Sequence, residues 1–199
     1  MFKKAIFCAL DVETTGLNCD IDEIIQFAGI LLDENLEVMK EITLHAHPTL
    51  EKLDKEALEA FAINGYTPER WEKLGATDQA GLVKNLQKFF YGNGELLAIG
   101  HNISFDIVFI TKAYENAGLE KDFKYLFQKQ LLDTITIALF CDIVKYNKKG
   151  FSYKLTSLCK RRGIPLKGDA HDSRTDAQAS LDLLHYLIKE LREGNKNVT

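Results

Sequence analysis

The segment AIFCALDVETTG, residues 5–16, carries the pattern from which both the fold and a candidate site follow. Its first six residues are apolar, which is typical of a buried strand, and we predict that strand over residues 5–11. Asp11 and Glu13 stand two positions apart, so both carboxylates would point to one face of a strand. Two neighbouring acids repel each other where water is scarce, and a divalent cation that prefers carboxylate oxygens relieves the repulsion. The segment therefore predicts a metal site at the end of a strand.

The composition is that of one globular domain. The chain has 199 residues, of which 46% are hydrophobic and 27% charged, and we predict a single domain over residues 1–193 with a frayed tail at 194–199. No apolar run approaches the ~20 residues of a membrane span, and the N-terminus lacks a secretory signal pattern. The four cysteines form no CxxC pair. We therefore expect reduced thiols, a cytoplasmic location and no membrane partner.

The charge is unevenly distributed along the chain. The net charge is −4, yet residues 143–168 contain eight basic residues and no acid. A local basic run can track a phosphate backbone even when the whole chain is acidic, and we favour this role over that of a solvated surface. Phe151 and Tyr153 within the run could stack on bases or could pack internally.

The hydrophobic spacing changes after the first 47 residues. An early group of short strands predicts an antiparallel meander, and alternating helices and strands after it predict a mixed α/β sheet with helices on both faces. The last helix would turn Ala179, Leu183, Tyr186 and Leu187 inward. The further strands are expected at 24–32, 36–47, 95–100 and 131–134, and the helices at 54–63, 79–91, 105–117, 134–140, 155–162 and 175–191.

Two more acids and a histidine complete a catalytic pattern. Asp106 follows a predicted strand at the start of a helix, where sites form in open α/β sheets. Asp176 lies five residues after His171, a spacing that separates them on a helix, so His171 must precede the helix if both serve one site. Four acids can hold two cations on either side of a scissile phosphate, and an imidazole can accept a proton from water near neutral pH.

Three motifs give the chain a resemblance to a known family. DVETTG (11–16), GHNISFD (100–106) and HDSRTDA (171–177) occur in the order and spacing of DnaQ-like 3′–5′ exonucleases of the DEDDh type. The resemblance implies a ribonuclease H-like sheet of five strands, three antiparallel and then two parallel, flanked by helices. It also implies a hydrolase that releases nucleoside 5′-monophosphates from a 3′ end with two Mg²⁺ or Mn²⁺ ions. Asp11, Glu13, Asp106 and Asp176 would be the metal ligands, and His171 the general base.

The same resemblance implies a set of substrate contacts. Thr14, Thr15, Gly16 and Leu17 would grip the terminal nucleotide through backbone groups and an apolar wedge, and the cleft would be lined by Asn64, His101, Asn102 and Phe105. Two positions depart from the family pattern. Gln26 stands where the second strand often carries an acid, and Arg174 stands where a small or apolar residue is commoner. The segment IIQFAGI resembles the branch that contains bacterial exonuclease I.

Several alternatives are open at the level of sequence. His45 and His47 could chelate a metal, although they read better as ordinary strand residues. The expected substrate is single-stranded DNA or a frayed end, with short RNA or tRNA ends as the alternative. A non-catalytic nucleic-acid-binding module is a third reading, which the complete set of acids and histidine disfavours. Proofreading or repair would require a polymerase or repair partner.

Overall fold

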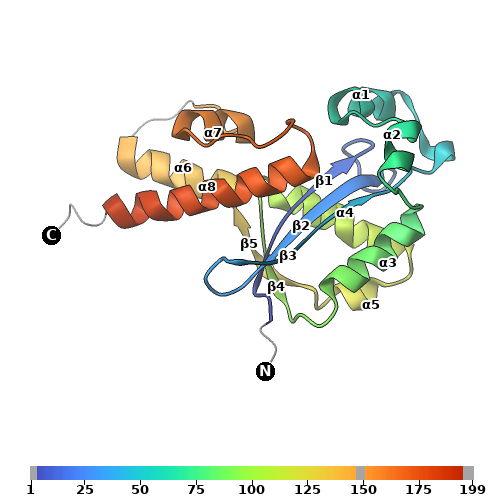
Figure 1. Cartoon of the computed structure of the whole chain (residues 1–199), viewed down its shortest axis with the longest axis horizontal. Coiled ribbons are helices and arrows are strands. Elements are labelled where there is room, and N and C mark those ends of the chain that lie inside the picture. Colours follow the sequence, from blue (N-terminus) through green and yellow to red (C-terminus); the bar gives the residue numbers. More distant parts are fainter. Residues whose placement is uncertain (1–3, 147–150, 195–199) are drawn as a thin grey trace.

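The computed structural model describes residues 4–146 and 151–194 and is built on one mixed sheet. Its strand order is β3-β2-β1-β4-β5 (Figure 1). The β1–β2 and β2–β3 pairs are antiparallel, whereas β1–β4 and β4–β5 are parallel. This arrangement confirms the predicted sheet. The strands are β1 (Phe7–Thr14), β2 (Ile24–Leu32), β3 (Val38–His45), β4 (Leu96–Gly100) and β5 (Phe127–Asp133).

Helices cover both faces of the sheet. The long helix α8 crosses one face with α6 and α7 beside it, while α3 and α4 cover the other face (Figure 1). The helices α1 and α2 stand near the end of β1. The bounds are η1 (Leu50–Lys52), α1 (Lys55–Asn64), α2 (Pro68–Lys73), α3 (Gln79–Phe90), α4 (Ile103–Asn116), α5 (Glu120–Phe123), α6 (Thr134–Tyr146), α7 (Leu155–Arg162) and α8 (Ser173–Gly194).

The central strand β1 contributes to two hydrophobic cores, because successive side chains of a strand point to opposite faces. Cys8 and Leu10 pack with the apolar sides of α3 and α4. Ala9 packs on the other face with Leu181 and Leu184 of α8. Asp11 and Glu13 lie two and four positions after Ala9 on the same strand. Their side chains therefore point to the same face of the sheet as Ala9, the face that α8 covers.

The structure corrects several predicted boundaries. β1 continues to Thr14, so the whole DVET segment is strand, and β3 ends at His45 before Pro48. β5 begins at Phe127, four residues before its predicted start. The prediction omitted η1, α2 and α5. α8 reaches Gly194, one residue past the predicted domain end, and the remaining predicted tail, 195–199, lies outside the described residues.

The prediction that Tyr186 of the last helix faces inward is wrong. Ala179, Leu183 and Leu187 are buried, but Tyr186 is 37% exposed. α8 packs against the sheet through Ala177, Leu181 and Leu184. It packs against α6 and α7 through Ala179, Leu183 and Leu187. Tyr186 lies outside both of these stripes.

The α1–α2 pair is fixed to the sheet by a buried tryptophan. Trp71 of α2 is 1% exposed, and its Nε1 donates to the backbone oxygen of Ile25 at 2.8 Å. Asn64, the last residue of α1, donates from Nδ2 to the backbone oxygen of Thr14 at 3.2 Å. These contacts hold α1 beside the end of β1, where the candidate site begins.

Two global expectations concern the membrane and the thiols. Across residues 4–146 and 151–194, no helix combines the length and apolarity that a bilayer crossing needs. All four cysteines are unpaired thiols, and Cys8, Cys141 and Cys159 are buried.

The two faces of α8 give a stability prediction. Leu183→Ala removes a fully buried side chain between α8 and its neighbours, and we expect it to lower the free energy of unfolding by about 2–5 kcal/mol. Tyr186→Ala on the same helix is the matched control and should change it by about 0.5 kcal/mol or less. Urea denaturation followed by circular dichroism measures both. Equal losses would contradict the assignment of the buried stripe.

Candidate active site

The candidate site lies where β1 extends past its parallel neighbour. β4 pairs with β1 only along Phe7–Ala9, so the β4 side of β1 is uncovered beyond that point. The other edge of β1 is still paired with β2 as far as Thr14. Sites in open α/β sheets form at such points, because side chains from several elements can converge on an exposed strand end.

Asp106 reaches this edge from the first turn of α4. Its side chain is 3% exposed, and Oδ1 accepts a hydrogen bond of 2.8 Å from the backbone nitrogen of Val12. That nitrogen lies between Asp11 and Glu13 in the sequence, so the contact fixes the third acid beside the first two. The predicted meeting of the first and second motifs is therefore present in the fold.

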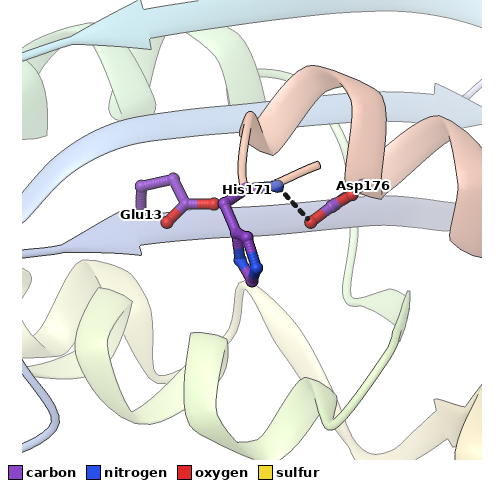
Figure 2. Close-up of side chains that lie close together, drawn as sticks. All are labelled: Glu13, His171 and Asp176. Atoms are coloured by element: carbon purple, nitrogen blue, oxygen red, sulfur yellow. Dashed lines mark hydrogen bonds between the residues drawn. The ribbon is translucent and has the colours of Figure 1, made fainter. Parts of the chain in front are cut away.

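The third motif reaches the site from the start of α8. His171 precedes the helix, as the spacing predicted, and its backbone has φ of 62°. Such a left-handed conformation costs most residues energy, although histidine tolerates it better than many. The His171 nitrogen donates to Oδ2 of Asp176 at 3.2 Å, while the imidazole ring points away from that carboxylate (Figure 2).

Glu13 of β1 joins these two residues. Glu13, His171 and Asp176 each offer a potential ligand atom, and the three atoms lie within 4.8 Å of one another (Figure 2). Residues 158 positions apart in the chain thus share one small volume. The identity of these side chains matches what a divalent cation takes in proteins: carboxylate oxygens and an imidazole nitrogen.

The four acids repel one another and are poorly hydrated. Burial, followed by the neighbouring carboxylates, raises the pKa of Asp11 well above its usual range and that of Glu13 to about 8. Burial also raises the pKa of Asp106 to about 8, although the Val12 N–H opposes this shift. The pKa of Asp176 is raised chiefly by burial as well. The shared cause is a cluster of like charges in a partly dry site.

A fifth acid, Asp172, contributes to the cluster and was not predicted as a site residue. Its charge raises the pKa of Asp11, Glu13 and Asp176. Its Oδ1 accepts from the backbone nitrogen of Thr175 at 3.1 Å, in the manner of a helix N-cap. Its position directly after His171 was the only signal in the sequence, since a capping role and a place in the cluster depend on how α8 meets the sheet.

The cluster fits divalent cations. Oδ1 of Asp176 is buried and accepts no hydrogen bond from the described residues. Within that part of the chain, no lysine or arginine forms an ion pair with any of the four acids. Cations are the groups that would satisfy the orphan oxygen and cancel the repulsion, because buried charges persist when they are paired or bound to metal.

A cleft of about 540 Å³ opens over this cluster. Seven of the predicted site residues line it, from β1, the loop after β1, α1, α4 and the start of α8. They are Glu13, Thr14, Gly16, Leu17, Asn64, Phe105 and His171. Leu17 is 85% exposed, and the Phe105 ring lies against Phe109 at an interplanar angle of 43° with ring centres 4.7 Å apart.

The loop after β1 is held in shape by its own side chains. Thr15 is 4% exposed, and its hydroxyl donates to Oδ1 of Asp22 at 2.9 Å. The Thr14 hydroxyl donates to the Gly16 oxygen at 2.6 Å. A Cβ on Gly16 would come within 2.5 Å of the Asp22 carboxylate, so a larger residue would displace the side chain that holds Thr15. Both threonine hydroxyls therefore shape the loop, which leaves Gly16 and Leu17 to face the cleft.

His101 and Asn102 lie at the end of β4 and differ in their surroundings. Both ring nitrogens of His101 are engaged, Nδ1 with the Thr134 hydroxyl at 2.9 Å and Nε2 with the Tyr153 oxygen at 2.8 Å. Burial lowers the pKa of His101 and so favours a neutral ring that donates from Nε2. Asn102 is exposed with φ of 64°, and its side chain makes no hydrogen bond to the described residues.

Part of the basic run 143–168 is structural where the structure describes it. Arg161 and Arg162 both bind Asp142 at 2.7 Å, and Asp142 and the Arg162 side chain are only 1% and 5% exposed. The prediction of phosphate tracking is therefore wrong for Arg162, because an acid preceding the run in sequence neutralises it. Lys148 and Lys149 lie outside the described residues, while Lys154 and Lys160 are exposed.

Five other cleft residues were also missed. Val12 belongs to β1, and Glu56, Glu59, Ala60 and Ile63 come from α1. The sequence pattern of the α1 residues is that of an ordinary amphipathic helix, so only the docking of α1 beside β1 reveals them. The two histidines of β3 and its end are not a metal pair: His45 contacts Gln26, and His47 contacts Tyr66 and Glu72.

Comparisons with known proteins agree with this geometry. A protein-family model described as an exonuclease, RNase_T, matches residues 8–184. The PolC-type DNA polymerase III of Listeria monocytogenes is 32% identical over 193 residues, which are 96% of this chain and 12% of the polymerase. The chain thus spans about an eighth of the length of the curated relatives that it matches.

Solved structures share the fold. Escherichia coli exonuclease I in complex with a dT13 oligonucleotide superposes with a TM-score of 0.78 at 20% identity, over 94% of this chain and 41% of that chain. The zinc-bound form of the same enzyme in complex with single-stranded DNA gives the same values. At this identity the similarity demonstrates the fold alone, and it confirms the ribonuclease H-like architecture.

The raised pKa values predict how stability depends on pH. In the folded, metal-free protein, Glu13 and Asp106 keep protons up to about pH 8, whereas the unfolded chain releases them near pH 4. Their contribution to the free energy of unfolding is complete below about pH 4 and is lost as the pH rises through about 8. We expect the Tm in EDTA to fall between about pH 6 and pH 9, and Mg²⁺ to raise the Tm more at the higher pH.

Asp106→Asn is the matched variant for this measurement. Its Oδ1 can still accept from Val12, while one charge is gone. Differential scanning fluorimetry should show a flatter pH dependence and a smaller response to Mg²⁺. A wild-type protein whose Mg²⁺ response is the same at both pH values would contradict the electrostatic account of the cluster.

Proposed function

Because the chain belongs to the RNase_T exonuclease family, we propose that it is a hydrolytic 3′–5′ exonuclease of the DnaQ-like type, which uses two divalent cations and a histidine base to release nucleoside 5′-monophosphates from a nucleic-acid 3′ end. The observation that carries this mechanism is the cluster formed by four acids and His171, from which Glu13 and His171 line the cleft. A non-catalytic binding module would not need this set, since a carboxylate cluster is costly without cations.

The cation ligands in this proposal are Asp11, Glu13, Asp106 and Asp176. Hard ions such as Mg²⁺ or Mn²⁺ suit a site made of carboxylate oxygens. When bound, the two cations would stabilise the charge that develops on the attacking and leaving oxygens of the phosphodiester. The Val12 N–H keeps Asp106 in place for this role, and the His171 N–H does the same for Asp176.

His171 would act as the general base. Its side chain is exposed at the cleft, and it stands outside the helix, so the ring can accept a proton from water. The oxygen of that water forms a bond to phosphorus while the bond from phosphorus to the 3′ oxygen breaks. The leaving 3′ oxygen then takes a proton from solvent, which balances the hydrolysis.

The cleft would hold the terminal nucleotide. Its volume of about 540 Å³ falls in the range of sites that hold one small ligand, about 300–1,000 Å³. Leu17 can separate the last base from the rest, and Phe105 offers an aromatic surface in the same cleft. Asn102 presents an unengaged amide near the end of β4. We propose that Thr14, Thr15, Asn64 and His101 maintain the shape of this cleft.

Single-stranded DNA is the proposed substrate. Proteins of the same fold have been solved as complexes with single-stranded DNA, and the sequence relatives are DNA polymerases. The resemblance to PolC-type polymerases also supports a polymerase or repair enzyme as partner and a cytoplasmic location. RNA is the alternative substrate, which the same degradation assay distinguishes.

His171→Asn tests the base directly. Asparagine tolerates the left-handed backbone of this position, so the fold should persist without the imidazole. We expect kcat to fall by about 10²–10⁴-fold on a labelled single-stranded oligonucleotide with Mg²⁺. The Tm should stay within a few degrees of the wild type. Unchanged turnover in this variant would refute a base role for His171.

Substrate preference is measured with matched oligonucleotides of one sequence. Single-stranded DNA, duplex DNA and RNA carry a label at the 5′ end, and the products are resolved by length. We expect a ladder of products that shortens by one nucleotide from the 3′ end, fastest on single-stranded DNA. If only the RNA is shortened, RNA and not DNA is the substrate. If no oligonucleotide is shortened with either Mg²⁺ or Mn²⁺, the proposed enzyme activity is contradicted.

A further inference from the structure

Gln26 of β2 is a buried amide with every hydrogen-bonding group engaged. The residue is 3% exposed. Its Oε1 accepts from the backbone nitrogen of Ser173 at 3.0 Å, and its Nε2 donates to Oδ2 of Asp172 at 2.9 Å. The second hydrogen of Nε2 points to Nε2 of His45, 3.1 Å away. One side chain thus joins β2, β3 and the start of α8.

The partner on β3 is suited to accept this bond. An amide nitrogen can only donate, so Nε2 of His45 must carry a lone pair. Burial lowers the pKa of His45, which favours the neutral ring that this contact requires. The His45 ring also packs edge-on against Trp71, with centroids 5.3 Å apart. Gln26 is therefore held from the side of the sheet before it reaches α8.

The two residues that Gln26 binds follow His171 directly. The Ser173 N–H belongs to the first turn of α8, where helix donors have no partner within the helix. Asp172 caps the same turn through Thr175. The peptide on the other side of His171 is held by the bond from its nitrogen to Asp176, the one hydrogen bond that the described residues give it. The backbone that carries the imidazole is thus clamped on its C-terminal side by Gln26.

An amide is the one common group that satisfies these contacts together. A carboxylate at position 26 could accept from Ser173 but would confront Asp172 at about the present 2.9 Å, where it would add a further charge to the cluster. An aliphatic side chain would leave the Ser173 N–H and the Asp172 oxygen unpaired in a buried place. This explains why glutamine suits a position where the resembled family often carries an acid.

We propose that Gln26 is a positioning residue for His171, which it places at the cleft by fixing Asp172 and Ser173 to the sheet. The role rests on the proposed function of His171 as the base. Gln26 itself does not line the cleft, so its loss should act on turnover rather than on substrate binding. Groups that orient a functional residue without touching the substrate commonly affect activity by about 10–100-fold.

The test compares Gln26→Leu and Gln26→Glu with a swapped pair. In the double variant Gln26→Glu with Asp172→Asn, the new amide at 172 can donate to the new carboxylate at 26, which still accepts from Ser173. We expect kcat to fall about 10–100-fold in each single Gln26 variant with KM within about threefold. The double variant should recover to within about fivefold of the wild type, which a loss of general stability would not produce.

Gln79→Leu is the matched control. Gln79 is also a glutamine that bridges two segments, through bonds of 3.0 Å to the oxygens of Ile24 and His47, but it lies away from α8. Its variant should keep kcat within about twofold. Thermal melting of all variants identifies any that do not fold. If Gln26→Leu is unfolded, comparing the kcat of the double variant with that of Gln26→Glu still tests the positioning role.

Amide hydrogen exchange supplies a readout that is independent of activity. Exchange at residues 171–174 should accelerate in Gln26→Leu and return towards the wild-type rate in the swapped pair, while the rest of α8 is unchanged. Full turnover in Gln26→Leu together with a dead His171→Asn would overturn the positioning role alone. Full turnover in His171→Asn would instead remove the base function on which that role rests.

Discussion

Repulsion among carboxylates at the uncovered end of β1 is the constraint on which the site depends. β4 leaves this strand after Ala9, and the space is taken by acids from α4 and α8. Their pKa values rise because burial and like charge both oppose ionisation. The arrangement costs stability unless protons or cations neutralise it. The proposed cations would bind there with an affinity tied to pH, because the same oxygens hold either protons or metal.

The sequence predicted the parts of the fold that depend on local pattern. The bounds of β2 (24–32) and α7 (155–162) are those expected, because a continuous apolar run and a helix stopped by glycine and proline are strong local signals. The start of α2 carried a signal that was overlooked: Thr67 caps the helix and Pro68 occupies its first turn. The prediction for Tyr186 is wrong because α8 packs against two partners. The helical period alone does not indicate where one apolar stripe ends and the next begins.

The candidate site was predicted from motifs, whereas its supports came only from tertiary contacts. Asp11, Glu13, Asp106, His171 and Asp176 stand in three recognisable segments that the fold brings together. The clamp by Gln26 joins this residue to Asp172, 146 positions away, and no spacing rule predicts such a pair. In the basic run, a tertiary contact removed a role that the sequence had predicted. Arg162 does not track phosphate, because α6 places the buried carboxylate of Asp142 against it.

Isothermal titration with Mn²⁺ tests the exchange of protons for cations most directly. The metal-free protein, saturated with a nucleoside 5′-monophosphate, is titrated near pH 7 in buffers that differ in their enthalpy of ionisation, so that proton release is measured with stoichiometry. We expect two Mn²⁺ ions per chain and a net release of protons, because acids with raised pKa values must ionise when they bind metal. Binding of one ion or none, or binding without proton release, would contradict the account.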